Sequence, residues 1–434
     1  MREMKKTNIS YIPQIPSNWK VARLKNVIDV LTDYTANGSF GDLAKNVQYL
    51  DFEDYARLVR LTDLRDNLDN VGVYVSEESY EYLGKSKLFG GEILVANVGA
   101  YAGLFCEMPC MTIPATLGPN MFLIRTNSLM TQHYLFYLGN AHFVWEQLMQ
   151  KAISSAQPKL NKTDVKTVYI AIPPIKEQKE ITEYLDYKCK ELDSSMADIQ
   201  KQVDVLEQYK RSVIIEAVTK GLNPDAGMRD SGTPWIGAMP QNWDIVRGKY
   251  ILNYVQKPIR EDDGVITCFR DGEVTLRSNR REDGFTMADK EIGYQGIDVG
   301  DLVVHGMDGF AGAIGISDSR GKASPVLNVL DTAQNKRYIM YYLRSMAYGD
   351  VFLALATGIR VRSCDLRWNK LAELVYPVPP REEQDAIVAH IDAIIKKTNA
   401  VIADKKAQLE TLDNYKKSLI YEYVTGKKEV PANV

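Results

Sequence analysis

The sequence predicts an α/β (α+β) protein in which two globular domains lie at opposite ends of an antiparallel pair of long coiled-coil helices, with a pseudo-two-fold internal repeat. Three observations carry this prediction. Residues 173–219 recur without gaps at 379–425, with 18 identities in 47 positions. In each copy a run of about 45 residues is interrupted by neither Pro nor Gly. A chain of 434 residues has room for two or three domains at roughly 150 residues each.

The similarity between the halves continues upstream of the long helices with small changes of offset. IPQIPSNWKVARLK at 12–25 matches IGAMPQNWDIVRGK at 236–249, and GEILVANVGAYAG at 91–103 matches GDLVVHGMDGFAG at 300–312. In each copy a strand-rich part comes first, and a short helix and a Pro-Pro pair precede the long helix. A period near 206 residues indicates duplicated domains, because solenoid repeats have periods of about 20–50 residues. The predicted parts are a first globular domain, 1–172, a central long helix, 173–222, a second globular domain, 233–378, and a C-terminal long helix, 379–428.

Apolar residues recur every seven positions along both long helices. This heptad pattern predicts a helix face that packs against a partner helix. The alternative, a surface helix on a globular core, is disfavoured because the segments are too long to lack a second apolar face. Thr398 and Lys405 interrupt one line of the second copy, so the predicted seam is imperfect there. The seam residues are Leu185, Leu192, Ile199, Leu206, Val213, Ile391, Ile395, Ile402, Leu409, Leu412 and Leu419.

Helix and connector lengths predict how the two helices run. A helix of 45 residues is about 67 Å long at ~1.5 Å per residue. The connector at 221–233 spans at most about 45 Å when fully extended, so it cannot return the chain to the start of the first helix. The second domain should therefore begin at the far end of the first helix, and the second helix should run back along it.

Composition excludes several classes of protein. The formal net charge is −3, so a nucleic-acid site would have to be a local basic patch. We expect no signal peptide and no membrane span, because neither an apolar run behind the first lysines nor 18 consecutive apolar residues occurs. Five cysteines without paired CxxC spacing argue against disulfides and zinc clusters, and they fit a reducing cytoplasm.

No catalytic or metal motif emerges from the sequence. The four histidines lack metal-ligand spacing, and GISDSRGKA at 315–323 departs from a phosphate loop and is better read as a hairpin turn. The two Pro-Pro pairs also lack the Asn/Asp-Pro-Pro-aromatic pattern of amino-methyltransferases. We therefore expect neither catalytic residues nor a bound metal or cofactor in this chain.

Two matched windows are locally basic. Residues 151–166 carry four lysines against Asp164, and residues 357–370 carry three arginines and one lysine against Asp365. Phosphate binding requires such clusters of positive charge, and the polar and aromatic neighbours could add further contacts. The alternative is a solvated loop beside an acidic helix start. The candidate DNA-binding residues in these windows are Lys159, Asn161, Lys162, Arg360, Arg362, Arg367 and Trp368.

A second candidate site is the arginine-rich segment 269–284, whose charge is cancelled by its own acidic residues. Arginine can bind guanine through two hydrogen bonds, which favours a DNA-reading role. A salt-bridged hairpin without a ligand is an equally good interpretation. The candidates in this segment are Arg270, Arg277, Arg280 and Arg281, and those in its counterpart at 59–67 are Arg60 and Arg65.

Taken together, these features resemble those of one protein family. The PSNW and PQNW openings, PPIKEQ at 173–178, PPREEQ at 379–384 and GIRVRSCDLRW at 358–368 are similar to the motifs of specificity subunits of type I restriction–modification systems. The resemblance covers nearly the whole chain. Base-contacting positions differ between members of the family, so the resemblance names none of the arginines above.

The resemblance implies a fold and a set of partners. Each globular part would be a target recognition domain that reads one half of a bipartite, asymmetric sequence in double-stranded DNA. The long helices would set the distance between the half-sites and dock two methyltransferase subunits, and two restriction subunits would join in systems that have them. S-adenosylmethionine, ATP and Mg would be bound by those partner subunits and not by this chain.

Two alternatives stay open at this point. A related system in which restriction and methylation are fused would differ only in the partners of this chain. A coiled-coil protein scaffold without DNA contact is disfavoured by the matched basic windows. The salt dependence of duplex binding would separate a DNA-binding specificity subunit from the scaffold, because a steep slope indicates phosphate contacts.

Overall fold

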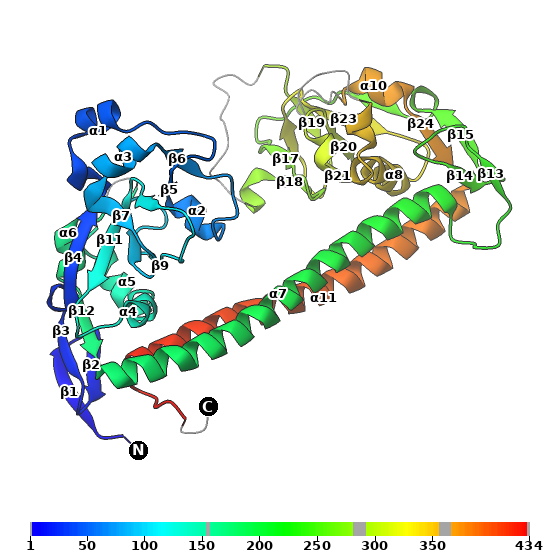
Figure 1. Ribbon diagram of the computed structural model, residues 1–434. Coiled ribbons are helices and arrows are strands. Elements are labelled where there is room, and N and C mark those ends of the chain that lie inside the picture. Colours follow the sequence, from blue (N-terminus) through cyan, green and yellow to red (C-terminus); the bar gives the residue numbers. More distant parts are fainter. Residues whose placement is uncertain (1, 153–156, 281–291, 356–365, 432–434) are drawn as a thin grey trace. The chain divides into compact units, whose positions relative to one another are not determined.

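The computed structural model describes residues 2–152, 157–280, 292–355 and 366–431. The chain forms two compact units of mixed helix and strand, as the fold class predicted (Figure 1). Unit 1 comprises Met1–Asp198 and Gln408–Val434, and unit 2 comprises Ile199–Ala407. Both long helices pass from one unit into the other. The domain boundaries predicted from the sequence stay a prediction.

Unit 1 contains two four-stranded sheets. The first has the order β4-β11-β8-β9 and is antiparallel throughout. The second has the order β6-β5-β10-β7, with one parallel pair between β5 and β10. The strands of unit 1 are β1 (Met4–Ile9), β2 (Ile12–Pro16), β3 (Lys20–Arg23), β4 (Ile28–Asp33), β5 (Ala56–Val59), β6 (Val73–Val75), β7 (Lys87–Leu88), β8 (Ile93–Ala96), β9 (Phe105–Glu107), β10 (Ala115–Leu117), β11 (Met121–Thr126) and β12 (Tyr169–Ile172). Its short helices are α1 (Phe40–Asn46), α2 (Leu61–Arg65), α3 (Glu77–Tyr82), α4 (Gln132–Gly139), α5 (His142–Met149) and α6 (Lys162–Lys166).

Unit 2 repeats this architecture. The sheet β16-β23-β20-β21 corresponds strand by strand to the first sheet of unit 1, and two strand pairs, β17-β18 and β19-β22, correspond to the second. Its strands are β13 (Met228–Asp230), β14 (Ala238–Pro240), β15 (Asp244–Arg247), β16 (Asn253–Val255), β17 (Ile266–Cys268), β18 (Val274–Leu276), β19 (Gln295–Ile297), β20 (Leu302–His305), β21 (Ile314–Ile316), β22 (Gly321–Ala323), β23 (Leu327–Asp331) and β24 (Val375–Val378). Its short helices are α8 (Lys336–Tyr348), α9 (Val351–Ala354) and α10 (Trp368–Glu373).

The two long helices are α7 (Ile175–Lys220) and α11 (Arg381–Val424). In unit 1 the first half of α7 packs against the end of α11, with Tyr184 beside Tyr423 and Asp193 paired with Lys416. In unit 2 the second half of α7 packs against the start of α11, and Lys210 donates to Asn399. The residue numbers of contacting partners rise along one helix as they fall along the other. The helices are therefore antiparallel within each unit.

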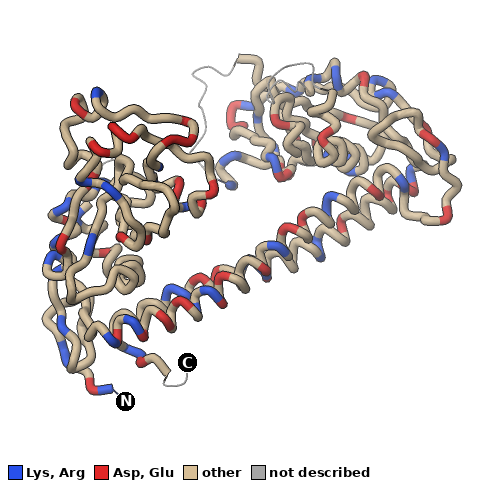
Figure 2. The backbone as a smooth tube through the Cα atoms, in the orientation of Figure 1, with Lys and Arg blue, Asp and Glu red and all other residues tan. Residues whose placement is uncertain are grey.

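The seam residues predicted from the heptads are all withdrawn from solvent. Leu185, Ile391, Ile402 and Leu419 are buried, and the remaining seven are half-buried. Thr398, which interrupts the apolar line, is nevertheless buried. Basic and acidic positions are interspersed along both helices, as Figure 2 shows.

The repeated PPxxEQ and PxNW motifs meet where each globular part joins its long helix. The buried Gln178 side chain donates to Pro173 O and accepts from the Thr131 backbone N–H, which begins α4. Gln384 does the same in unit 2 with Pro379 and Asn335, which begins α8. The Gln amide supplies both the acceptor and the donor that these two buried backbone groups need, and its loss would leave them unpaired.

Two further properties are relevant to function. Within the described residues, no helix is both long and apolar enough to cross a membrane. In the same part of the chain, no group of three or more His, Cys, Asp or Glu side chains is placed to hold a metal ion.

Candidate nucleic-acid interface

The arginine-rich segment of unit 2 forms one wall of a cavity. β17 and β18 pair as a hairpin, and Arg270 lies in the turn between them. This hairpin, the turn after β20 and the residues before β23 surround a cavity of about 770 Å³. The charged lining groups are Arg270, Asp271, Arg277, Arg280 and Asp308, His305 adds an imidazole ring, and the apolar groups include Ile266, Phe269, Val326 and Leu327.

Two of the predicted arginines are held by carboxylates. Arg280 lies 2.6 Å from the Asp271 carboxylate and 3.1 Å from that of Glu273, with its guanidinium over the Phe269 ring. Arg270 pairs with Asp308 at 2.9 Å, although its side chain is 63% exposed. The salt-bridged hairpin that the sequence left open as an alternative is therefore present. It still directs arginine side chains into the cavity wall.

Helix α8 holds the turn of this hairpin in place. The Arg344 guanidinium donates to Asp271 O at 2.7 Å and to the Tyr348 hydroxyl at 2.9 Å. Gly312, at φ +95°, lies so close that a Cβ there would be 2.7 Å from Arg270 O. A glycine is needed at 312 both for the left-handed backbone and for this approach. The GFAG segment at 309–312 is thus a turn that packs against the hairpin.

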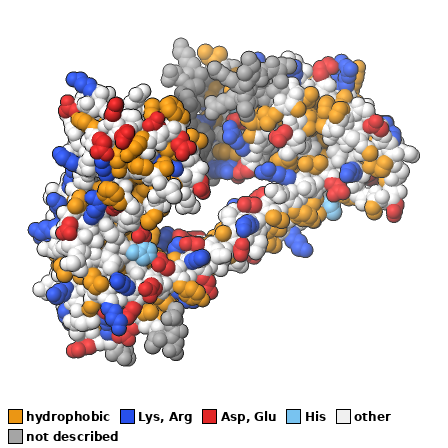
Figure 3. All heavy atoms as spheres, viewed as in Figure 1, with side chains coloured by type: hydrophobic (Ala, Val, Ile, Leu, Met, Phe, Trp, Pro, Cys, Tyr) orange, Lys and Arg blue, Asp and Glu red, His pale blue; other side chains and the backbone are white. Residues whose placement is uncertain are grey.

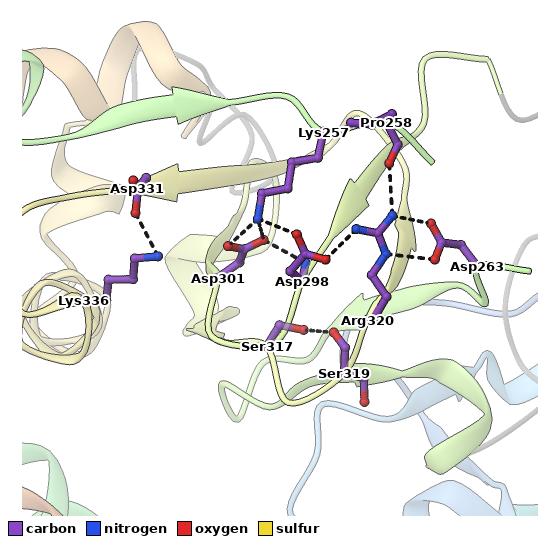
Figure 4. Close-up of polar contacts among 10 residues, drawn as sticks. All are labelled: Lys257, Pro258, Asp263, Asp298, Asp301, Ser317, Ser319, Arg320, Asp331 and Lys336. Carbon is purple, nitrogen blue, oxygen red and sulfur yellow. Dashed lines mark hydrogen bonds and ion pairs between the residues drawn. The ribbon is translucent and has the colours of Figure 1, made fainter. Parts of the chain in front are cut away.

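A network of charged side chains anchors the loop that leads into β17 (Figure 4). Arg320 contacts Asp263 at 2.9 Å and Asp298 at 2.5 Å, and it also donates to Pro258 O. Lys257 contacts Asp298 at 2.9 Å and Asp301 at 2.7 Å. Hydrogen bonds from Lys257 and then Arg320 lower the pKa of the Asp298 carboxyl to about 2. The root of the hairpin is therefore held by an ion network that stays charged over the physiological pH range.

The basic window of unit 2 is only partly described. Arg360 and Arg362 lie outside the described residues, and so does Arg281 of the arginine-rich segment. Arg367 is exposed at the start of α10. Trp368 is half-buried and stacks on Tyr254 at 6.2 Å, so it contributes to the domain core. The ring of this tryptophan therefore stacks on a side chain of the protein itself.

In unit 1 the corresponding window has structural contacts of its own. Asn161 caps α6 by accepting from the Asp164 backbone N–H at 3.0 Å, and Lys162 pairs with Asp33 at 2.9 Å. Lys159 is exposed and its backbone bridges to Val98, in the loop after β8. Of the three predicted residues, Lys159 thus presents its charge most openly to solvent.

Arg60 and Arg65 lie on the loop between β5 and β6, which corresponds to the hairpin of unit 2. Arg60 holds the buried Asp63 carboxylate through two hydrogen bonds of 2.9 and 3.0 Å. Arg65 is exposed and lies over the Tyr101 ring, 4.1 Å from its centroid. The structure thus separates two arginines that look alike in the sequence. Arg60 stabilises the loop, and Arg65 faces solvent.

Sequence reasoning missed a basic cleft between α7 and the globular part of unit 2. It has a volume of about 630 Å³ and shares Arg270 and Asp271 with the hairpin cavity. Lys210 and Arg211 from α7 face Arg344 from α8 across it, and Arg211 lies over the Tyr348 ring. In the sequence, the basic pair on α7 is hidden among the alternating charges of a helix surface.

A second missed feature joins each globular part to its long helix. In unit 1, His133 lies 2.6 Å from Glu107 and 2.8 Å from Asp186, which also accepts from the Tyr137 hydroxyl. In unit 2, Arg337 and Tyr341 contact Asp392 in the same way at 2.6 and 2.5 Å. The 206-residue offset relates Asp186 to Asp392, and it was the signal that could have identified this pair.

The chain is similar to several known proteins. Residues 16–205 match the model of the type I restriction modification DNA specificity domain. This part of the chain is therefore similar to that domain. A type I restriction enzyme specificity subunit of Methanocaldococcus jannaschii, MjaX, is 24% identical over 98% of this chain and 96% of its own length. The StySPI specificity subunit of Salmonella potsdam is 18% identical over 95% of this chain and 90% of its own length.

The fold agrees with this family. A solved chain from work on complex assembly and conformational transition of the type I R-M system superposes with a TM-score of 0.64. That match covers 95% of this chain and 99% of the other at 16% identity, so it concerns the fold alone. The predicted resemblance to type I specificity subunits is confirmed. On the face in Figure 3, basic, acidic and hydrophobic side chains are interspersed.

Proposed function

We propose that this type I specificity domain protein is the DNA-recognition subunit of a type I restriction–modification complex and has no catalytic activity of its own. It recognises a bipartite, asymmetric sequence in double-stranded DNA. The alternatives, a fused restriction–methylation system and a scaffold without DNA contact, are not favoured by the relatives described above.

The observation that carries the proposal is that one architecture occurs twice with different side chains at the same place. Equivalent hairpins leave β5 in unit 1 and β17 in unit 2. The first presents Arg65 beside an aromatic ring, whereas the second presents Arg270 beside Asp308. Equal folds with unequal reading groups suit a site whose two halves differ in sequence.

The partners follow from the family and from the helix pair. We expect two methyltransferase subunits to dock on the long helices, and restriction subunits to join them where the system has them. S-adenosylmethionine, ATP and Mg belong to those subunits in this proposal. In this proposal the length of the antiparallel helix pair sets the distance between the half-sites.

Two measurements test the proposal. The affinity of the full-length protein for a mixed-sequence duplex should fall steeply between 50 and 200 mM salt if several phosphates are contacted, since each contact adds about one unit to the log–log slope. A flat salt dependence would favour the scaffold. Methylome sequencing of cells with and without the protein should then show a two-part motif that depends on it. Unchanged methylation would overturn the assignment.

A further inference from the structure

The cavity beside the β17–β18 hairpin contains a histidine whose tautomer is set by the backbone. His305 Nδ1 accepts hydrogen bonds from the backbone N–H groups of Met307, at 3.2 Å, and Asp308, at 2.9 Å. A ring nitrogen that accepts must carry a lone pair, so the proton of the neutral ring is on Nε2. Burial lowers the pKa of this ring, which keeps it neutral near pH 7.

Among the described residues, no carboxylate lies within hydrogen-bond distance of the Nε2–H donor. The nearest, Asp308 Oδ2, is 3.9 Å away, and Asp308 is already paired with Arg270. The ring is 18% exposed and lines the cavity. A fixed donor therefore points toward the cavity, where a ligand with an acceptor could meet it.

The rest of the lining is rich in donors as well. Arg277 enters the wall beside Thr267, to whose hydroxyl its Nε donates at 3.4 Å. The two acidic groups of the wall, Asp271 and Asp308, are held by Arg280 and Arg270. The cavity thus offers N–H groups, while its acceptors are largely occupied. A ligand that presents neighbouring acceptors is the best match to this lining.

We propose that this cavity reads a guanine in the half-site bound by unit 2, with His305 Nε2–H donating to guanine N7 and Arg277 donating to O6. The inference rests on the proposed function and names the base that one part of the interface reads. In the major groove guanine presents two neighbouring acceptors, whereas adenine presents an acceptor beside an N–H₂ donor. Adenine would place that donor against donors of the protein.

A phosphate group also presents acceptors, but the lining fits a base better. Ile266, Val326 and Leu327 give the cavity an apolar side, and Phe269 contributes a ring face. A phosphate in contact with these groups would lose hydration without compensation, whereas the edge and face of a base are apolar in part. Guanine is therefore favoured over phosphate.

Two substitutions separate base reading from the structural role of His305. His305→Asn keeps an oxygen near Nδ1 to accept from Met307 and Asp308, but it lacks a donor at the Nε2 position. His305→Gln places an amide N–H₂ near Nε2 and gives up the Nδ1 acceptor. His390→Asn, on the exposed face of α11, is the matched control. If His305 only caps the turn, His305→Asn should disturb DNA binding less than His305→Gln. If His305 reads a base, His305→Gln should disturb DNA binding less.

The experiment measures binding of the full-length protein to its methylome-defined site, with 7-deazaguanine replacing one guanine of the second half-site at a time. Loss of N7 at one position should weaken wild-type binding about tenfold or more. His305→Asn should abolish that sensitivity, while His305→Gln and His390→Asn keep it. The wild-type protein alone tests the inference if a variant fails to fold.

Three outcomes would overturn the inference. They are a second half-site without a G·C pair, equal affinity for every 7-deazaguanine duplex, and sensitivity to a neutral methylphosphonate at one phosphate in place of sensitivity to the base. In each case wild-type binding and its salt dependence persist, so the proposed function stands. Loss of all salt-dependent duplex binding would instead refute the proposed function itself.

Discussion

The bridge from α4 to α7 through His133 predicts a pH-dependent stability that belongs to unit 1 alone. The hydrogen bond to Glu107, opposed by burial and reinforced by Asp186, raises the pKa of His133 to about 9. A group whose pKa is raised by folding stabilises the folded state. This stabilisation is fully present at pH values below the unfolded-state pKa of about 6.5. That stabilisation is lost as the pH rises through about 9.

The magnitude follows from the size of the pKa shift and from the exposure of the ring. A shift of roughly 2.5 units corresponds to about 3 kcal/mol at ~1.4 kcal/mol per unit. The His133 side chain is 37% exposed, so solvent screening reduces the expected loss to about 1–2 kcal/mol between pH 6.5 and pH 10. The equivalent bridge in unit 2 should not respond, because it contains Arg337 in place of a histidine.

The assay is hydrogen exchange measured by mass spectrometry, corrected for intrinsic rates, on the segments 132–139 and 180–192. The opening free energy of these segments should fall as the pH rises in the wild-type protein. The opening free energy of the equivalent segments of unit 2 should fall less. His133→Arg, which copies unit 2, should remove the pH dependence while keeping the bridge, and His133→Gln should remove both. If His133→Gln keeps the wild-type pH dependence, the reasoning is refuted.

Three further predictions concern the joints, the helix pair and the recognition domains. Gln384→Ala should destabilise unit 2 by about 1–3 kcal/mol through unpaired buried groups at the Asn335 N–H and Pro379 O, whereas exposed Gln200→Ala should change it by less than 0.5 kcal/mol in urea unfolding. Seven-residue insertions after Asp198 and Leu409, which match the antiparallel register, should lengthen the helix pair by about 10 Å at ~1.5 Å per residue. Methylome sequencing should then find a changed spacer, and methylation at the old spacer would mean that the helices do not set the distance. Exchanging residues 250–357 for those of a relative should alter one half of the methylated motif, and a change in both halves would contradict independent reading.

The sequence predicts the helices of this protein better than its surface chemistry, for a physical reason. Heptads are local, so the burial of Leu185 and Ile391 could be expected from neighbouring residues alone. The partner of a charged group is set by long-range packing, which one sequence does not reveal. Arg270 meets Asp308, 38 positions away, and His133 meets Asp186, 53 positions away.

The candidate site shows the same limit. The basic windows correctly identified segments rich in charge, but not which charges are already neutralised inside the fold. Arg60 and Lys162 hold carboxylates of their own unit, while Arg65 and Lys159 remain exposed. His305 carried no signal in the sequence, because its importance derives from two backbone N–H groups that only the turn brings together.

The strands β3 and β12 are hydrogen-bonded neighbours, and so are β15 and β24. Each globular part therefore leaves and rejoins the helical framework at a single place. A gene segment that encodes everything between such paired strands can be lengthened, lost or exchanged by recombination while the framework keeps the same two ends to close. New specificities can then arise by transfer of whole segments, without waiting for point mutations to rebuild a reading surface one side chain at a time.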